Sequence, residues 1–231
     1  GCLMKLFELV GCDKDNGFSP FVWRTKLALA HKGLEAELVP LHFSEIRNTL
    51  EFSGSKTVPV LEDGDNVISD SWDIACYLEE NYSDKPSLFG GDAAKVGLNL
   101  LSLQIGKSLL MPLFKTIAAD IHDVLHDMDK DYFRKSREQR IGCSIEEAAE
   151  DFKTPLKLFK GNLWPYSQHL KSEDFLAGAA PAYSDYMLYS TFLWARGSSM
   201  KKIVDDNDPL VDWLSRMDQL FGGLGGQVKY I

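Results

Sequence analysis

The chain has 231 residues, of which 45% are hydrophobic and 26% are charged. This length fits one or two ordinary domains, and the apolar content suffices for a folded core and excludes a disordered chain. The net charge of −9 excludes a nucleic-acid partner, because nonspecific binding to phosphates needs a basic face. No apolar run approaches the roughly 20 residues that span a bilayer, and residues 1–10 lack an export signal, so we expect a cytoplasmic protein with no membrane partner.

Strand and helix patterns alternate in the first part of the chain, which carries 8 basic residues against 15 acidic ones in residues 1–85. Short apolar runs predict strands, and apolar residues at helical spacing predict helices. The turn residues Asp63, Gly64 and Asp65 predict a hairpin. In chain order the expected elements are a strand at 6–10, a helix at 20–32, a strand at 37–41, a helix at 44–50, hairpin strands at 58–61 and 67–69, and a helix at 70–82.

The rest of the chain has helical periodicity only. We expect helices at 95–124, 144–170, 184–194 and 210–221, with bends at Pro155 and Pro165. A segment with turn chemistry at 83–92 separates the two patterns. The sequence therefore predicts an α/β domain with the order βαβαββα at 1–85 and an all-helical domain at 93–231.

Ser19 stands directly before Pro20, which opens the first expected helix. A serine N-cap followed by proline is a favourable way to begin any helix. The same geometry places a hydroxyl beside the positive end of a helix dipole, where it can stabilise an anion such as a thiolate. The residues alone leave both interpretations open.

Two further strings have a structural and a functional interpretation. Pro59 after Val58 is typical of an edge strand or a turn, whereas a cis bond there would turn the backbone of Val58 outward to pair with a peptide ligand. Asp70 and Ser71 form a helix cap, but together they could also hold the ammonium and carboxylate groups of an amino acid. Neither string decides between its two interpretations.

The histidines and cysteines suggest no metal or redox site. His122 and His126 have the spacing of a zinc helix, yet no third ligand has convincing spacing, so we expect a polar helix face and no metal. Cys2, Cys12 and the two other cysteines show neither CxxC nor metal spacing, which is typical of ordinary thiols in a reducing compartment.

In this order, the strings at Ser19, Val58–Pro59 and Asp70–Ser71 resemble the glutathione transferases over nearly the whole chain. The string Ser-Pro-Phe-Val-Trp-Arg-Thr-Lys from Ser19 is similar to the active-site loop of the Omega class with serine at the cysteine position. Its form, with Trp194-Ala195-Arg196, is most similar to the lignin β-etherase-related fungal FuA class. One departure is Ala182, which stands where the family usually has a Ser or Thr cap and should leave Asp185 without its reciprocal partner.

The resemblance implies a thioredoxin-like first domain, a homodimer, and glutathione as cosubstrate with no metal. Ser19 would stabilise the glutathione thiolate for attack on aromatic or lignin-derived electrophiles or β-aryl ethers. Glutathione would be held by Val58, Pro59, Asp70 and Ser71, and its glycyl carboxylate by Lys56, Arg47 or His42. The candidate walls of the aromatic site are Phe21, Trp23, Phe114, Tyr132 and Phe133, although aromatics at helical spacing are more often core residues.

Two alternatives remain. A non-catalytic ligandin could hold aromatic molecules between the domains. A thiol reductase of the Omega type is disfavoured because Ser19 cannot form a mixed disulfide, and Cys12 lies seven residues earlier in a Gly/Asp-rich loop.

Overall fold

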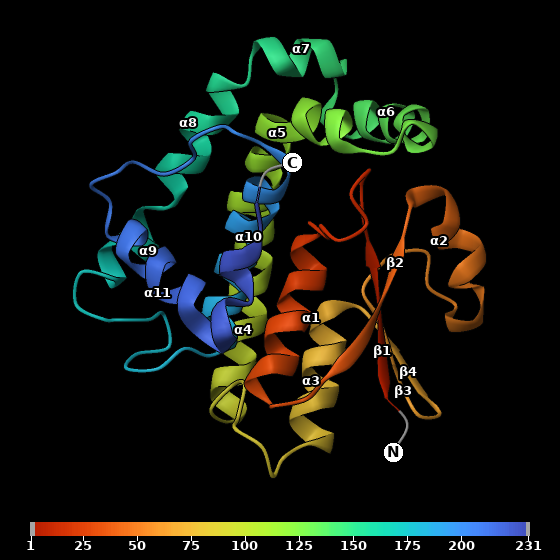
Figure 1. The fold of residues 1–231 in the computed structure, drawn as a ribbon. Helices are drawn as coiled ribbons and strands as arrows, with labels where there is room; N and C mark the ends of the chain where they lie inside the picture. The colour runs from red at the N-terminus through yellow and green to blue at the C-terminus, as the bar shows by residue number, and fades with distance from the viewer. Residues whose placement is uncertain (1–2, 230–231) are drawn as a thin grey trace.

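The structure is a computed structural model that describes residues 3–229. Its first part is a four-stranded mixed sheet with helices on both faces, as the sequence predicts (Figure 1). The strands lie in the order β2-β1-β3-β4; β1 and β2 are parallel, and β3 is antiparallel to β1 and β4. The elements of this part are β1 (Met4–Leu9), α1 (Pro20–His31), β2 (Ala36–Leu41), α2 (Phe43–Thr49), a short 3-10 turn (Glu51–Ser53), β3 (Val60–Asp63), β4 (Asn66–Ser69) and α3 (Ser71–Asn81).

The second part is entirely helical in the residues that the structure describes, which confirms the expected fold class. Most of its helices lie on the α1 and α3 side of the sheet, with α10 against α1, whereas α6 contacts α2 (Figure 1). They are α4 (Asp92–Ile105), a π-helical turn (Gly106–Leu110), α5 (Met111–Val124), α6 (Asp127–Ile141), α7 (Ile145–Glu150), α8 (Lys153–Asn162), α9 (Trp164–His169), α10 (Tyr183–Ser198), α11 (Pro209–Gly223) and a 3-10 turn (Gly225–Gln227).

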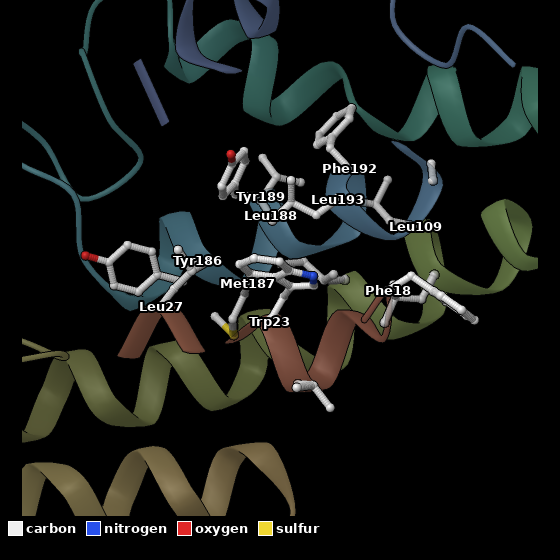
Figure 2. Close-up of a cluster of buried hydrophobic side chains, with 14 of the residues drawn as sticks. Phe18, Trp23, Leu27, Leu109, Tyr186, Met187, Leu188, Tyr189, Phe192 and Leu193 are labelled. Carbon is white, nitrogen blue, oxygen red and sulfur yellow. The ribbon is translucent and has the colours of Figure 1, made fainter. Parts of the chain in front are cut away.

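Side chains on the two faces of the sheet enter different cores. Leu6 of β1 joins a large cluster that continues through α1 into α10 and the other helices, as Figure 2 shows around Trp23 and Met187. Phe7 and Leu9 belong to a smaller cluster beneath α2. The large cluster links the two parts of the chain, whereas α2 lies on the other face of the sheet with a small core of its own.

Two helical expectations are wrong in detail. The helix α6 was not expected, because Asp127–Ile141 is so polar that it shows almost no apolar periodicity. The expected helix at 144–170 is three helices, and its breaks fall before the prolines. Pro155 and Pro165 each lie in the first turn of a helix, where the missing N–H removes no helical hydrogen bond.

The continuous helical stretch Asp92–Val124 is, by length and composition alone, long and apolar enough to cross a membrane, a test that a core helix also passes. Part of this apolar surface is core, including Ile105, Leu109 and Leu113. Another part, formed by Val96, Leu100 and others, is exposed on α4. The stretch is thus a helix that packs in the core along part of its surface.

Candidate functional site

Ser19 is the N-cap of α1, as predicted. Its backbone is extended, with φ −62° and ψ 126°, and Pro20 occupies the first helical position. The hydroxyl oxygen accepts a hydrogen bond from the N–H of Val22 at 3.4 Å, and the residue is 8% exposed. Since a hydroxyl is both donor and acceptor, the O–H of Ser19 can donate to an anion while its oxygen caps the helix.

The loop before Ser19 is fixed from three sides. A β-bridge joins Val10 to Gly17, and the N–H of Cys12 donates to the carbonyl of Val124 at the end of α5 at 2.9 Å. The amide of Asn16 donates to the carbonyl of Gly197 near the end of α10 at 3.2 Å. The position of Ser19 is therefore set jointly by the sheet and by two helices of the second part.

Trp23 supports this loop from the core. Its indole N–H donates to the carbonyl of Gly17 at 2.9 Å, and the ring lies in the core (Figure 2). The ammonium of Lys26 lies 4.4 Å from the Trp23 ring centroid and forms an ion pair of 2.8 Å with Glu8 of β1, both largely buried. Trp23 is thus a buried support of the loop, and its role as a wall of the aromatic site stays a prediction.

The peptide bond between Val58 and Pro59 is cis, which answers the question that the sequence left open. Pro59 is buried, and Val60 begins β3 directly after it. β3 lies between β1 and β4, so this bond is placed at the entrance of a central strand.

Asp70 and Ser71 form the expected helix cap. Asp70 has φ 75° and ψ 127°, a conformation that is uncommon for a residue other than glycine. Its carboxylate accepts the N–H groups of Trp72 at 2.9 Å and Asp73 at 3.2 Å. Ser71 is buried, and its carbonyl accepts a hydrogen bond from the Tyr183 hydroxyl of α10 at 3.4 Å.

Arg24 of α1 was not singled out from the sequence, yet it is only 3% exposed. One guanidinium nitrogen donates to the Ser102 hydroxyl at 3.3 Å, while Nε and Nη2 have no hydrogen-bond partner. Burial lowers the pKa of Arg24, and the nearby Tyr183 and Asp70 act in the opposite direction. An arginine in an apolar helical pattern gives no sequence signal that it will be buried.

The three basic candidates for the glycyl carboxylate lie in different surroundings. Lys56 and Arg47 are exposed. His42 is half-buried at the start of α2, where Nδ1 lies 3.9 Å from the carboxylate of Asp129 on α6. The choice among the three stays a prediction.

The remaining aromatic candidates form contacts across several helices. Phe21 is 42% exposed beneath the Arg24 guanidinium. Phe114 stacks on Trp194, with ring centroids 6.0 Å apart and planes 7° apart, and packs edge-on against Phe133. Tyr132 is exposed and lies 6.0 Å from the Phe43 ring of α2.

The two histidines with zinc-like spacing do not share a helix. α5 ends at Val124, and His126 is the N-cap of α6. His122 instead lies beside Asp123 and Phe133. In residues 3–229 there is no group of three or more His, Cys, Asp or Glu side chains that could hold a metal ion.

Asp185 at the start of α10 is better held than expected. Ala182 offers no side-chain cap, but the fully buried Asp185 carboxylate accepts four N–H groups, from the Trp213 indole and the backbones of Leu176, Ala177 and Ala182, at 2.7 to 3.2 Å. Asp185 thus lacks the reciprocal bond of a Ser or Thr cap, as expected, but the loop before α10 folds back over its carboxylate and supplies other donors.

Comparison with known proteins identifies the family of this chain. Residues 18–81 match the N-terminal domain of glutathione S-transferases, and residues 101–220 match their C-terminal domain. The chain belongs to the glutathione S-transferase family. The N-terminal match includes Ser19, the cis Pro59 and the Asp70–Ser71 pair, which carried the resemblance in the sequence.

Curated relatives share modest identity with this glutathione S-transferase family member. The glutathione S-transferase-like protein ustS of Aspergillus flavus is 29% identical over 58% of this chain and 52% of its own length. A zeta-class glutathione S-transferase of Euphorbia esula is 37% identical over 39% of this chain and 42% of its own. The chain thus spans about half the length of the first curated relatives that it matches.

Solved structures of fungal glutathione transferases share its fold. Glutathione transferase GSTFuA3 of Phanerochaete chrysosporium has a TM-score of 0.76 and 24% identity, covering 98% of this chain and 94% of its own. A glutathione S-transferase of Ceriporiopsis subvermispora, solved in complex with glutathione, has a TM-score of 0.84 and 17% identity, covering 96% and 98%. At this identity, the likeness is one of fold.

Proposed function

We propose that this chain is a glutathione transferase in which the Ser19 hydroxyl donates a hydrogen bond to the glutathione thiolate. The observation that carries the proposal is the free O–H of Ser19 at the start of α1, on a loop held by both parts of the chain. Glutathione itself is supported by family membership and by a relative in the same fold that was solved with glutathione.

The hydrogen bond from Ser19 and the N-terminus of α1 together can lower the pKa of the glutathione thiol enough to ionise it. A thiol with a pKa of about 8.5 is about 3% ionised at pH 7, and lowering that pKa by about two units requires about 2.7 kcal/mol. A hydrogen bond to a charged acceptor contributes about 1.5 to 3 kcal/mol, and a helix N-terminus adds up to about 1 kcal/mol. No general base is required, so Ser19 acts as a donor and the thiolate is the nucleophile.

Around the thiolate, we assign the γ-glutamyl group to Asp70 and Ser71 and the peptide backbone to Val58 at the cis proline. Lys56 is our first choice for the glycyl carboxylate, with Arg47 and His42 as alternatives. The second substrate is an aromatic electrophile or a β-aryl ether, in keeping with the FuA-like sequence. The candidate walls of its site are Phe21, Trp23, Phe114, Tyr132 and Phe133. We keep the division between the two domains at 83–92, a range that follows α3 and ends at the first residue of α4.

We further propose that the protein acts in the cytoplasm as a homodimer. Val96, Leu100 and Leu103 of α4 are 72%, 68% and 67% exposed and recur at the spacing of one helix face. A contiguous apolar stripe of this kind marks a protein interface. A second copy of this chain, offering the same stripe, would cover it.

The test of the catalytic proposal is Ser19→Ala, assayed with glutathione and a general aryl halide, with Ser19→Thr as the control that keeps a hydroxyl. We expect Ser19→Ala to lose about 10- to 150-fold in kcat/KM, the equivalent of the hydrogen bond to a charged acceptor. We also expect it to raise the pKa of bound glutathione, measured by thiolate absorbance. Turnover equal to wild type would remove the role of Ser19, and tight aromatic binding without turnover in the wild type would favour the ligandin.

A further inference from the structure

The polar helix α6 lies across the end of the sheet where β1 and β2 finish and where the Ser19 loop begins (Figure 1). Of its fifteen residues, all within the described part of the chain, only Asp129 and Phe133 are buried. A helix with so few buried side chains is held by a small number of contacts, and such elements open more readily than core helices.

Asp129 makes an unusual contact for a fully buried carboxylate. Its Oδ2 accepts the backbone N–H of Phe43 at 3.1 Å, and its Oδ1 accepts the N–H of Ser44 at 3.0 Å. These donors belong to the first turn of α2, where backbone N–H groups have no partner within the helix. The helix cap of α2 is thus supplied by α6, from the other part of the chain.

The N-cap residue of α2 does not supply this cap itself. The backbone N–H of His42 donates to Glu45, and His42 Nδ1 has no hydrogen-bond partner. The His42 ring instead packs against the ring of His126, with centroids 5.0 Å apart. The start of α2 therefore depends on Asp129, because the His42 side chain does not accept the N–H groups of Phe43 and Ser44.

Aromatic contacts continue from this hydrogen-bonded pair of helices into the candidate aromatic site. Phe43 lies 6.2 Å from Phe133, and the Arg137 guanidinium lies over both rings, at 5.3 and 5.5 Å. Phe133 packs on Phe114, which stacks on Trp194. Since Phe133 is 2% exposed and lies among Phe43, Phe114 and Arg137, an aromatic ligand can stack on Phe133 only if α6 shifts.

We propose that Asp129 is a positioning residue that latches α6, as a lid, over the candidate aromatic site. With the latch closed, α6 holds the first turn of α2 and the aromatic rings remain packed on one another. Opening breaks the two hydrogen bonds to Phe43 and Ser44 and exposes the rings to ligand. The role of the lid in catalysis rests on the proposed function, whereas its opening can be measured without glutathione.

The experiment compares Asp129→Asn with Asp127→Asn. Both changes remove one negative charge from the first turn of α6, but the Asp127 side chain is 94% exposed and contacts only Lys130. For Asp129→Asn we expect backbone hydrogen exchange at least tenfold faster in 43–49 and 127–141, with exchange in α10 unchanged. We also expect severalfold faster association of 8-anilinonaphthalene-1-sulfonate in stopped flow, with Asp127→Asn within twofold of wild type in both measurements.

The latch is overturned if Asp129→Asn matches Asp127→Asn in either measurement. It is equally overturned if Asp129→Asn accelerates exchange throughout both parts of the chain, because Asp129 would then support the whole fold. Neither measurement uses glutathione chemistry, so a failure of the Ser19 proposal leaves this test intact. If both proposals hold, Asp129→Asn should lower the KM for the aryl halide, because a larger fraction of the protein is then in the open state that admits the ligand.

Discussion

At the scale of single residues, Gly17 shows how tightly the loop before Ser19 is packed. A Cβ at this position would lie 1.8 Å from Glu8 Oε1 and 2.8 Å from Glu8 Cδ. Glu8 cannot move away cheaply, because it is 4% exposed and paired with Lys26. The loop therefore requires glycine at position 17 because a Cβ would clash with Glu8, and not because of the backbone angles.

We expect Gly17→Ala to lower the free energy of unfolding by about 1 to 3 kcal/mol, the usual cost of overpacking a buried site. The control is Gly161→Ala in α8, where a Cβ meets no atom within 4 Å and helix propensity should add up to about 1 kcal/mol. Urea unfolding of both variants measures the difference. Equal stability of Gly17→Ala and wild type would show that the Glu8–Lys26 pair relaxes freely.

At the scale of elements, α10 begins without a side-chain cap on its N-cap residue. Ala182 has an extended backbone, with φ −148° and ψ −163°, so the residue already has the conformation of an N-cap. Asp185 supplies the hydrogen bond in one direction only, by accepting the N–H of Ala182 at 3.1 Å. A hydroxyl at this position would complete the reciprocal pair.

We expect Ala182→Ser to raise the free energy of unfolding by about 0.5 to 1 kcal/mol, since a serine cap replaces alanine. Ala182→Gly serves as the comparison: glycine is a better N-cap than alanine but lacks the hydroxyl, so we expect it to be a few tenths of a kcal/mol less stable than Ala182→Ser. Thermal unfolding of the three proteins measures the order. A serine variant no more stable than the glycine variant would contradict the cap argument.

The helices also show where local sequence is informative and where it is not. The pattern of Ser19 and Pro20 predicts both the start of α1 and its cap, because capping depends on residues within one turn. α6 escapes prediction because helical periodicity requires apolar residues, and this helix buries one carboxylate and one aromatic ring. The role of Asp129 depends on a partner 85 residues away, which no local pattern contains.

At the scale of the whole molecule, the two-part organisation was predictable because the sequence pattern changes from mixed to purely helical along the chain. The contacts that build the candidate site could not be predicted in this way. Arg24, His42 and Asn16 each meet residues of the second part, and the sequence gives no distance between segments that are far apart in the chain. The residues of the site could be assigned from sequence motifs, whereas the contacts that hold them in place became known only from the structure.

The exposed stripe on α4 leads to a prediction about assembly. We expect the wild type to be dimeric at micromolar concentration and Leu100→Glu to be monomeric, because a charge in the centre of an apolar interface is left desolvated and unpaired. Light scattering after size-exclusion chromatography measures the mass. The matched control is Leu158→Glu in α8, a leucine that is 57% exposed elsewhere; a monomer in the wild type would remove the dimer proposal.

Glu79 of α3 joins the two parts of the chain and makes stability depend on pH. Its carboxylate accepts hydrogen bonds from the fully buried ammonium of Lys32 at 2.6 Å and from the N–H groups of Leu88 and Phe89, which precede α4. Burial alone would raise the pKa of Glu79, but hydrogen bonds from Lys32, Leu88, Ser87 and Phe89 outweigh it and lower the pKa to about 2.

Because the pKa of Glu79 is lower in the folded protein than in the unfolded chain, where it is about 4.3, the unfolded state binds more protons as the pH falls. The contribution of Glu79 is therefore complete above about pH 5 and is lost between that pH and about 2. The full shift would correspond to about 3 kcal/mol, and solvent screening of this partly exposed group reduces it to about 1 to 2 kcal/mol.

We expect Glu79→Gln to lower the free energy of unfolding by this amount at pH 7 and to show a weaker dependence of that free energy on pH in urea unfolding from pH 7 to 3. Glu80→Gln, whose carboxylate lies on the exposed side of α3 and is 3.8 Å from Lys95, should keep the wild-type pH dependence. Parallel acid limbs for Glu79→Gln and wild type would show that Glu79 does not carry the linkage between pH and stability.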